Sequence, residues 1–199
     1  MSLLIPRLSM FSLLDFGTRS TRAGAHSAVM TPVQRFDRAD SKSDEFSVGW
    51  DLIAQEHRVR AAGARILHLF GEVLNFEGTP ISGAIVDIRQ CDANGREPKG
   101  HLSARDFLGV GRAVTDFEGR YQFRTILPSP DHKCTAHIEA RVTPPTGRTL
   151  STKLYLLDHL ANETDWTFQA LGPSGQAAVS LDPVERSDGD LDAGFNFVL

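Results

Sequence analysis

His137 and Glu139 lie two positions apart, and both side chains can transfer protons. Imidazole titrates near neutral pH and a carboxyl group can hold or deliver a proton, so the pair suits general acid–base chemistry. In a strand, successive side chains point to opposite sides, which places both residues and Arg141 on one face. The other face then carries the apolar residues Ile138, Ala140 and Val142. A polar face of this kind is either solvated or part of a site.

The strand that carries this pair is one of several in the sequence. Residues 120–126 alternate too, with Tyr121, Phe123 and Thr125 on one face. Further strands are predicted at residues 65–75, 84–91, 112–115, 149–157 and 195–199. Short helices are expected within residues 50–61 and 159–166, and a loop at 172–175. Seven or eight short strands separated by turn residues predict an all-β protein, an antiparallel β-sandwich with few short helices.

Length and composition fit one globular domain of 199 residues. We expect the β-sandwich over residues 46–199 and an arm over residues 1–45, because the first 45 residues have no apolar core of their own. The arm is either a partly disordered tail or a strap packed on the domain or on a second subunit. The net charge of −4 gives no electrostatic case for nucleic-acid binding.

Nothing in the sequence predicts a membrane or a secretory protein. No stretch reaches the ~20 apolar residues that span a bilayer. The apolar pieces near the amino end are interrupted by Pro6, Arg7 and Asp15, so they lack the unbroken apolar centre of a signal peptide. Two cysteines, Cys91 and Cys134, cannot build a disulfide framework. We therefore expect a cytoplasmic protein.

The sequence contains a series of motifs: Gly71-Glu-Val, Gly78-Thr-Pro-Ile-Ser-Gly-Ala-Ile-Val-Asp-Ile, Cys91-Asp-Ala-Asn-Gly-Arg, Gly109-Val-Gly-Arg, Gly119-Arg-Tyr-Gln-Phe-Arg-Thr-Ile-Leu-Pro, Ala136-His-Ile and Leu154-Tyr. Together these motifs resemble the intradiol ring-cleavage dioxygenases, the family of the catechol and protocatechuate dioxygenases. The similarity runs from about residue 64 to residue 157, and the final Phe-Asn-Phe-Val-Leu resembles the last strand of shorter bacterial members. The resemblance implies the intradiol type of β-sandwich.

The resemblance also implies a site, and this chain departs from the family there. Family enzymes hold a ferric ion with two tyrosines and two histidines, and the matching positions here are Glu97, Asp131, His137 and Glu139. Only His137 keeps the family residue. Two further positions differ, because Cys134 replaces a family arginine and Lys153 replaces a glutamine. Since the changes concentrate on the metal pocket, they indicate a changed function.

The substituted set favours chemistry without a ferric ion. One imidazole with three carboxylates is closer to a site for divalent iron, manganese, magnesium or calcium, and Glu97, Asp131, His137 and Glu139 are the ligands that we expect if any metal or non-haem iron is bound. Our prediction is that no cofactor is needed. Repulsion among three crowded carboxylates would then raise the pKa of some of them. A carboxyl group with a raised pKa can act as a general acid, and His137 would be the base.

Other residues are weaker candidates. We predict that substrate is bound by Cys134, Lys153 and His132. The simpler interpretations are an unreactive thiol at Cys134 and an exposed loop histidine at His132. Tyr121 and Tyr155 follow strand patterns and are expected to be structural.

Three hypotheses follow from the sequence. The first is a repurposed enzyme that carries out a redox-neutral acid–base reaction, such as a cyclisation, dehydration or isomerisation, on a phenolic or polyketide-like small molecule. The second is a ring-cleaving dioxygenase with a divergent non-haem iron site. The third is a non-catalytic partner subunit or small-molecule-binding protein. In each case the expected partner is a small aromatic or polyketide-like ligand, and a homo-oligomer such as a dimer is expected.

Overall fold

The computed structural model describes residues 29–34, 49–98, 106–130 and 135–199. Most of the predicted arm, and the predicted site residues Asp131, His132 and Cys134, lie outside these ranges. In the described part of the chain, no helix is long and apolar enough to cross a membrane.

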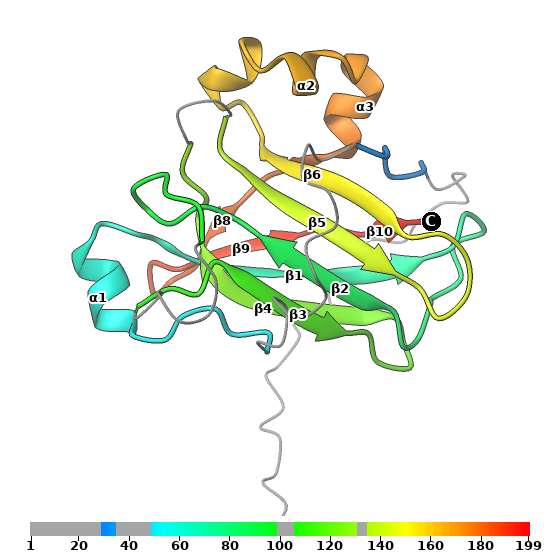
Figure 1. Cartoon of the computed structure of the whole chain (residues 1–199), viewed down its shortest axis with the longest axis horizontal. Helices are drawn as coiled ribbons and strands as arrows, with labels where there is room; N and C mark the ends of the chain where they lie inside the picture. The colour runs from blue at the N-terminus through cyan, green and yellow to red at the C-terminus, as the bar shows by residue number, and fades with distance from the viewer. Residues whose placement is uncertain (1–28, 35–48, 99–105, 131–134) are drawn as a thin grey trace, which may run out of the picture.

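Two five-stranded sheets pack face to face, which confirms the predicted β-sandwich (Figure 1). The first sheet has β1 at its centre, with β4 on one side and β9 and β10 on the other, and β8 next to β9. The second sheet has the order β3-β2-β5-β6-β7. The strands of the first sheet are β1 (Ile66–Leu74), β4 (Arg120–Ile126), β8 (Val184–Glu185), β9 (Leu191–Gly194) and β10 (Phe197–Val198). Those of the second are β2 (Ile85–Arg89), β3 (Val110–Val114), β5 (His137–Thr143), β6 (Leu150–Leu156) and β7 (Ser180–Leu181).

The core lies between the two sheets, because each strand turns its apolar side chains inward. On β5, Ile138, Ala140 and Val142 are buried, as the alternation predicted. On β4, Tyr121, Phe123 and Thr125 are buried likewise. The hydroxyl of Tyr121 donates a hydrogen bond of 2.7 Å to the carbonyl of Phe195, so Tyr121 fastens the last part of the chain to the core. The outer face of β5 is left for polar side chains.

The helices are short and lie at the ends of the sandwich. They are α1 (Glu56–Ala61), a 3₁₀ turn (Leu160–Glu163), α2 (Trp166–Gln169) and α3 (Gly172–Ala178). Figure 1 shows α2 and α3 beyond the end of β6. The loop prediction for residues 172–175 was wrong, because Pro173 occupies the first turn of α3, where a missing backbone N–H costs nothing.

Pairing directions differ in part from the antiparallel prediction. The long pairs, β1 with β4 and β5 with β2 and β6, are antiparallel. The short strands near the carboxyl end pair in parallel, β9 and β10 with β1, and β7 with β6. A crossing connection is needed for a parallel pair, and the helical segment between β6 and β7 supplies it here.

The described piece of the predicted arm, residues 29–34, links the two sheets. The backbone N–H of Thr31 donates to the carbonyl of Val198 at 3.1 Å, and that of Gln34 donates to the carbonyl of Ser151 at 2.8 Å. The side chain of Gln34 is buried and also accepts from the hydroxyl of Tyr155 at 3.1 Å. Residues 29–34 are therefore held on β10 and β6.

Candidate active site

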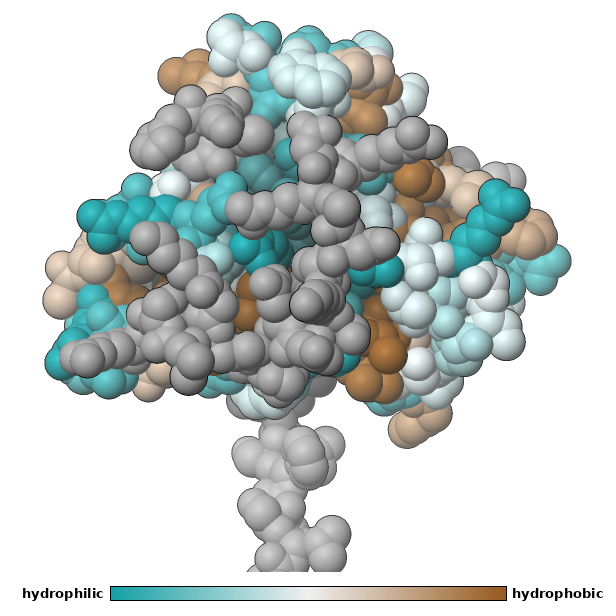
Figure 2. Space-filling model, in the orientation of Figure 1, coloured by the Kyte–Doolittle hydropathy of each residue, from teal (hydrophilic) through white to brown (hydrophobic). Residues whose placement is uncertain are grey.

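The candidate site lies on the outer face of the second sheet, where three neighbouring strands place charged side chains side by side. In the strand register Glu139 of β5 has Arg89 of β2 on one side and Lys153 of β6 on the other. Figure 2 shows hydrophilic side chains on this face. Since a carboxylate between two cations is stabilised by both, the register fixes Glu139 as an anion.

His137 is the neighbour of Glu139 on the same face, and its two ring nitrogens have different partners. Nδ1 lies 2.7 Å from the carbonyl oxygen of Thr135. A carbonyl can only accept, so Nδ1 carries a hydrogen and donates it. In the neutral ring Nε2 therefore carries the lone pair, and it lies 3.9 Å from Oε1 of Glu139. The side chain of His137 is 12% exposed, so the ring is largely shielded from solvent.

The pKa of Glu139 is shifted by two opposing effects. Burial alone would raise it, because a carboxylate loses solvation inside the protein. The ring of His137, 3.9 Å away, and the cations of Lys153 and Arg89 lower it more, so the pKa of Glu139 stands below its ordinary value. Glu139 is thus ionised at neutral pH and suits the stabilisation of a protonated His137.

We expect Glu139→Gln to reduce the free energy of unfolding at pH 7 by about 2 kcal/mol, because it leaves the neighbouring cations without their carboxylate. A carboxylate with a lowered folded pKa stabilises the fold above its unfolded pKa of about 4.3, and this stability is lost as the pH falls through the folded value. The difference between wild type and variant should therefore be full at pH 7 and shrink below about pH 4. Urea denaturation at several pH values measures it.

Glu185→Gln is the matched control, since Glu185 pairs with Arg65 on the surface and is 66% exposed. An exposed pair contributes less than about 1 kcal/mol, so this variant should unfold like wild type. Equal losses for Glu139→Gln and Glu185→Gln would contradict the special setting of Glu139.

The structure brings together only some of the predicted site residues. His137, Glu139 and Lys153 lie on one face, and Lys153 is 9% exposed. Glu97 is exposed on the connection that follows β2. Within the described ranges, no three or more histidine, cysteine, aspartate or glutamate side chains are arranged to hold a metal ion. The convergence of all four predicted residues stays a prediction, since Asp131 lies outside the described residues.

Sequence reasoning missed two contributors to this site. Arg89 was not among the predicted site residues, and only the register shows it beside Glu139. Thr135 holds the ring of His137 through its backbone carbonyl, which any residue type could provide. No pattern of residue types could have identified Thr135.

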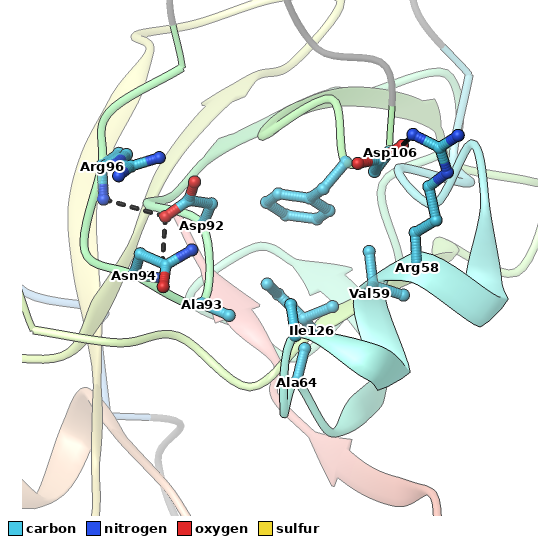
Figure 3. A pocket seen from close by; sticks show the side chains of 11 residues that line it. Arg58, Val59, Ala64, Asp92, Ala93, Asn94, Arg96, Asp106 and Ile126 are labelled. Atoms are coloured by element: carbon cyan, nitrogen blue, oxygen red, sulfur yellow. Dashed lines mark hydrogen bonds and ion pairs between the residues drawn. The ribbon is translucent and has the colours of Figure 1, made fainter.

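A hollow of about 360 Å³ lies elsewhere, between α1 and the turn that follows β2 (Figure 3). Apolar side chains form much of its wall, and charged residues stand around it, among them Arg58 and Asp106, which are 3.5 Å apart. The wall contains Val59, Ala62, Ala64, Ala93, Phe107 and Ile126. It contains none of the predicted catalytic or substrate-binding residues, so the hollow is separate from the candidate site.

The described residues do not fit the ferric ion that the resemblance implies. The chain has two tyrosines, and both are buried with their hydroxyl groups engaged, Tyr121 with Phe195 and Tyr155 with Gln34. Burial also raises the pKa of Tyr121 well above its ordinary value, which opposes a tyrosinate ligand. Around Glu139, a trivalent ion would meet the fixed charges of Arg89 and Lys153.

The fold and these residues can now be compared with known proteins. A family profile described as dioxygenase matches residues 46–165, which is more than half of the chain. The chain belongs to the intradiol ring-cleavage dioxygenase family, as its motifs predicted.

Two curated relatives share parts of the sequence. The protocatechuate 3,4-dioxygenase beta chain of Burkholderia cepacia is 42% identical over 71 residues, which cover 33% of this chain and 30% of the relative. The 6-chlorohydroxyquinol 1,2-dioxygenase of Cupriavidus pinatubonensis is 26% identical over 149 residues, which cover 66% of this chain and 52% of the relative. The chain thus spans about half or less of the length of these relatives.

Solved structures with the same architecture include two dioxygenases. The dioxygenase domain of a dioxygenase and carbohydrate-binding fusion protein from Streptomyces sp. SirexAA-E has a TM-score of 0.69 at 23% identity, covering 86% of this chain and 98% of that domain. The 3-chlorocatechol 1,2-dioxygenase of Rhodococcus opacus 1CP has a TM-score of 0.66 at 18% identity, covering 83% and 70%. At these identities the likeness shows the fold.

Proposed function

We propose that this protein binds a phenolic or polyketide-like ring compound on the outer face of β2, β5 and β6, and catalyses a redox-neutral acid–base reaction on it. The observation that supports the proposal most directly is the pair formed by His137 and Glu139, with Nδ1 of His137 donating to Thr135 and Nε2 3.9 Å from Oε1 of Glu139. This arrangement presents one basic nitrogen in a fixed orientation. A histidine base oriented by a second group and paired with a carboxylate is suited to proton abstraction.

The proposed reaction moves a proton and no electrons. Nε2 of His137 takes a proton from a phenolic oxygen or from a carbon next to a carbonyl, and the electron pair of the broken bond stays on the ring compound. Glu139 stabilises the imidazolium that forms, because the two groups are 3.9 Å apart. The imidazolium then returns the proton to another atom of the same molecule. In an isomerisation these two transfers suffice. In a dehydration the freed electron pair forms a double bond, the C–O bond breaks, and the returned proton leaves with the hydroxyl group as water. In a cyclisation the freed electron pair forms the ring bond to a carbonyl carbon, whose oxygen receives the proton.

Lys153 is proposed to bind the negative charge that develops on the ring compound. Its side chain is nine-tenths buried on the same face as Glu139. The charge of its ammonium group lowers the pKa of Glu139, so a cation lies beside the pair formed by His137 and Glu139. Preorganised donors beside a developing oxyanion are an effective source of rate enhancement.

Ring cleavage with a divergent iron site is the second candidate, because the relatives and solved structures named above are all described as dioxygenases. Two assays on the wild-type protein separate the candidates. The first measures oxygen consumption with catechol and with hydroxyquinol after incubation with iron. The second measures elimination of 5-nitrobenzisoxazole, a ring compound that needs only a general base to react. We expect no oxygen consumption, and elimination about 100-fold faster than with free imidazole at equal concentration.

Oxygen uptake equal to the ring compound supplied would overturn the redox-neutral proposal in favour of ring cleavage. Inactivity in both assays would also overturn it and would favour the non-catalytic partner subunit. Purification of the protein together with a second family chain would then be the supporting observation for that third hypothesis.

A further inference from the structure

We propose that Asp165 is a positioning residue that fixes the orientation of His137 through Thr135, an inference that rests on the proposed role of His137 as a base. Asp165 is 30 positions from Thr135 in the chain and makes no direct contact with the face that carries Glu139 in the described hydrogen bonds. Its action on His137 passes through the backbone of one residue, Thr135, whose N–H and carbonyl groups belong to successive peptide groups.

Asp165 lies at the start of α2 and divides its two carboxylate oxygens between two tasks. Oδ1 accepts hydrogen bonds from the backbone N–H groups of Thr167 at 2.9 Å and Phe168 at 3.1 Å, which is the usual work of a helix cap. Oδ2 accepts from the backbone N–H of Thr135 at 3.2 Å. The residue is 7% exposed, so the second bond is formed away from solvent. A cap alone would not require it.

Thr135 is held from two directions. Its backbone N–H bonds Asp165, and its hydroxyl donates to Oδ1 of Asn162 at 2.9 Å and lies 3.1 Å from Nδ1 of His159. Asn162 is in turn bound to the carbonyl of Leu156 at 2.8 Å, at the end of β6. Because Thr135 is 3% exposed and bonded at its amide and side chain, its carbonyl oxygen has a fixed direction.

That carbonyl is the acceptor for Nδ1–H of His137, at 2.7 Å. A fixed acceptor selects the neutral imidazole with hydrogen on Nδ1 and the lone pair on Nε2, the form in which Nε2 can act as a base. If the carbonyl could turn away, the tautomer with hydrogen on Nε2 would gain population and the base would be blocked. Asp165, Thr135 and His137 therefore form a chain that sets the tautomer, with Asp165 at its buried end.

Asp165→Asn tests this chain, because an asparagine can still cap α2 through its carbonyl oxygen while its NH₂ group cannot accept from Thr135. Nitrogen-15 NMR of the histidine side chains in the uncomplexed protein measures the tautomer of His137. We expect its Nε2–H fraction to rise about fivefold in Asp165→Asn, with elimination of 5-nitrobenzisoxazole slowed to a similar degree. A general disturbance of the fold would not change the tautomer of His137 alone. The Nε2–H fraction of His57, on α1, serves as the internal reference.

Asp116→Asn is the matched control, since Oδ1 of Asp116 accepts from the backbone N–H groups of Glu118 and Arg120 in an exposed turn. It should leave the spectrum of His137 unchanged. Thr135→Ala and Thr135→Ser provide a second pair of variants. The alanine should raise the Nε2–H fraction because it loses the anchor to Asn162, and the serine should restore the wild-type value.

An unaltered His137 tautomer in folded Asp165→Asn, or in folded Thr135→Ala if the first variant does not fold, overturns the positioning role. A shifted tautomer with an unchanged elimination rate would instead contradict the proposed function of His137 while leaving the positioning role intact. The two failures are thus distinguishable.

Discussion

His137→Ala is expected to lower the rate of 5-nitrobenzisoxazole elimination by about 100-fold at pH 7.5, the lower end of what a positioned general base contributes. The reason is that Nε2 of His137 is the proposed proton acceptor, and its neighbour Glu139 is ionised and stabilises only the protonated ring. The phenolate product absorbs visible light, so the rate is followed directly. Circular dichroism checks that the variant folds.

His57→Ala is the control for this experiment. His57 is an exposed residue of α1, outside the sheet face that carries Glu139, so its removal should leave the rate within about twofold of wild type. If His137→Ala retained the wild-type rate, His137 would not be the base. A similar loss in both histidine variants would show that elimination depends on imidazole groups in general and not on this site.

Alternation was sufficient to predict β5 and the orientation of its side chains, because a strand buried on one side repeats with a period of two residues. The same argument located β2, β4 and β6. It could not give the parallel pairing of β9 and β10 with β1, since four- and two-residue strands carry almost no pattern. The extended bridge between Asp51 and Arg124 was missed for the same reason, and a helix was predicted there.

For the site, the sequence predicted which side chains share a face of one strand, but not which residues of other elements lie beside them. The closeness of His137 and Glu139 follows from one alternating segment. The position of Arg89 beside Glu139 depends on a register between strands 50 residues apart, which hydrophobic pattern leaves open. The contact from Asp165 to Thr135 joins a helix cap to a backbone amide, and neither residue was among the predicted site residues. Backbone groups are common to all residues, so their roles are invisible in a sequence.

The family motifs of this chain maintain the fold more than the site, and Gly71 illustrates this. Gly71 and Phe195 belong to two of the segments that resemble the family, and they meet in the structure. The backbone N–H of Phe195 donates to the carbonyl of Phe70 at 2.8 Å, while its own carbonyl accepts from Tyr121. Asn196 accepts from the N–H of Glu72 at 2.9 Å. The carboxyl-terminal segment is thus bound to β1 at Gly71, the position where β1 has no side chain to keep it away.

Gly71→Ala should therefore destabilise the protein by at least about 3 kcal/mol, because overpacking against backbone cannot be relieved by a rotamer change. A Cβ atom at this position would lie 1.8 Å from the carbonyl oxygen of Phe195. To remove the clash, the carboxyl-terminal segment would have to leave β1 and give up its bond to the buried hydroxyl of Tyr121. Urea denaturation measures the loss of free energy of unfolding.

Gly49→Ala is the control, since a Cβ atom there meets nothing within 4 Å, and its free energy of unfolding should stay within about 0.5 kcal/mol of wild type. Equal stability of the two alanine variants would mean that the chain end is not held on β1 in solution, and the conservation of fold that these motifs imply would need another explanation.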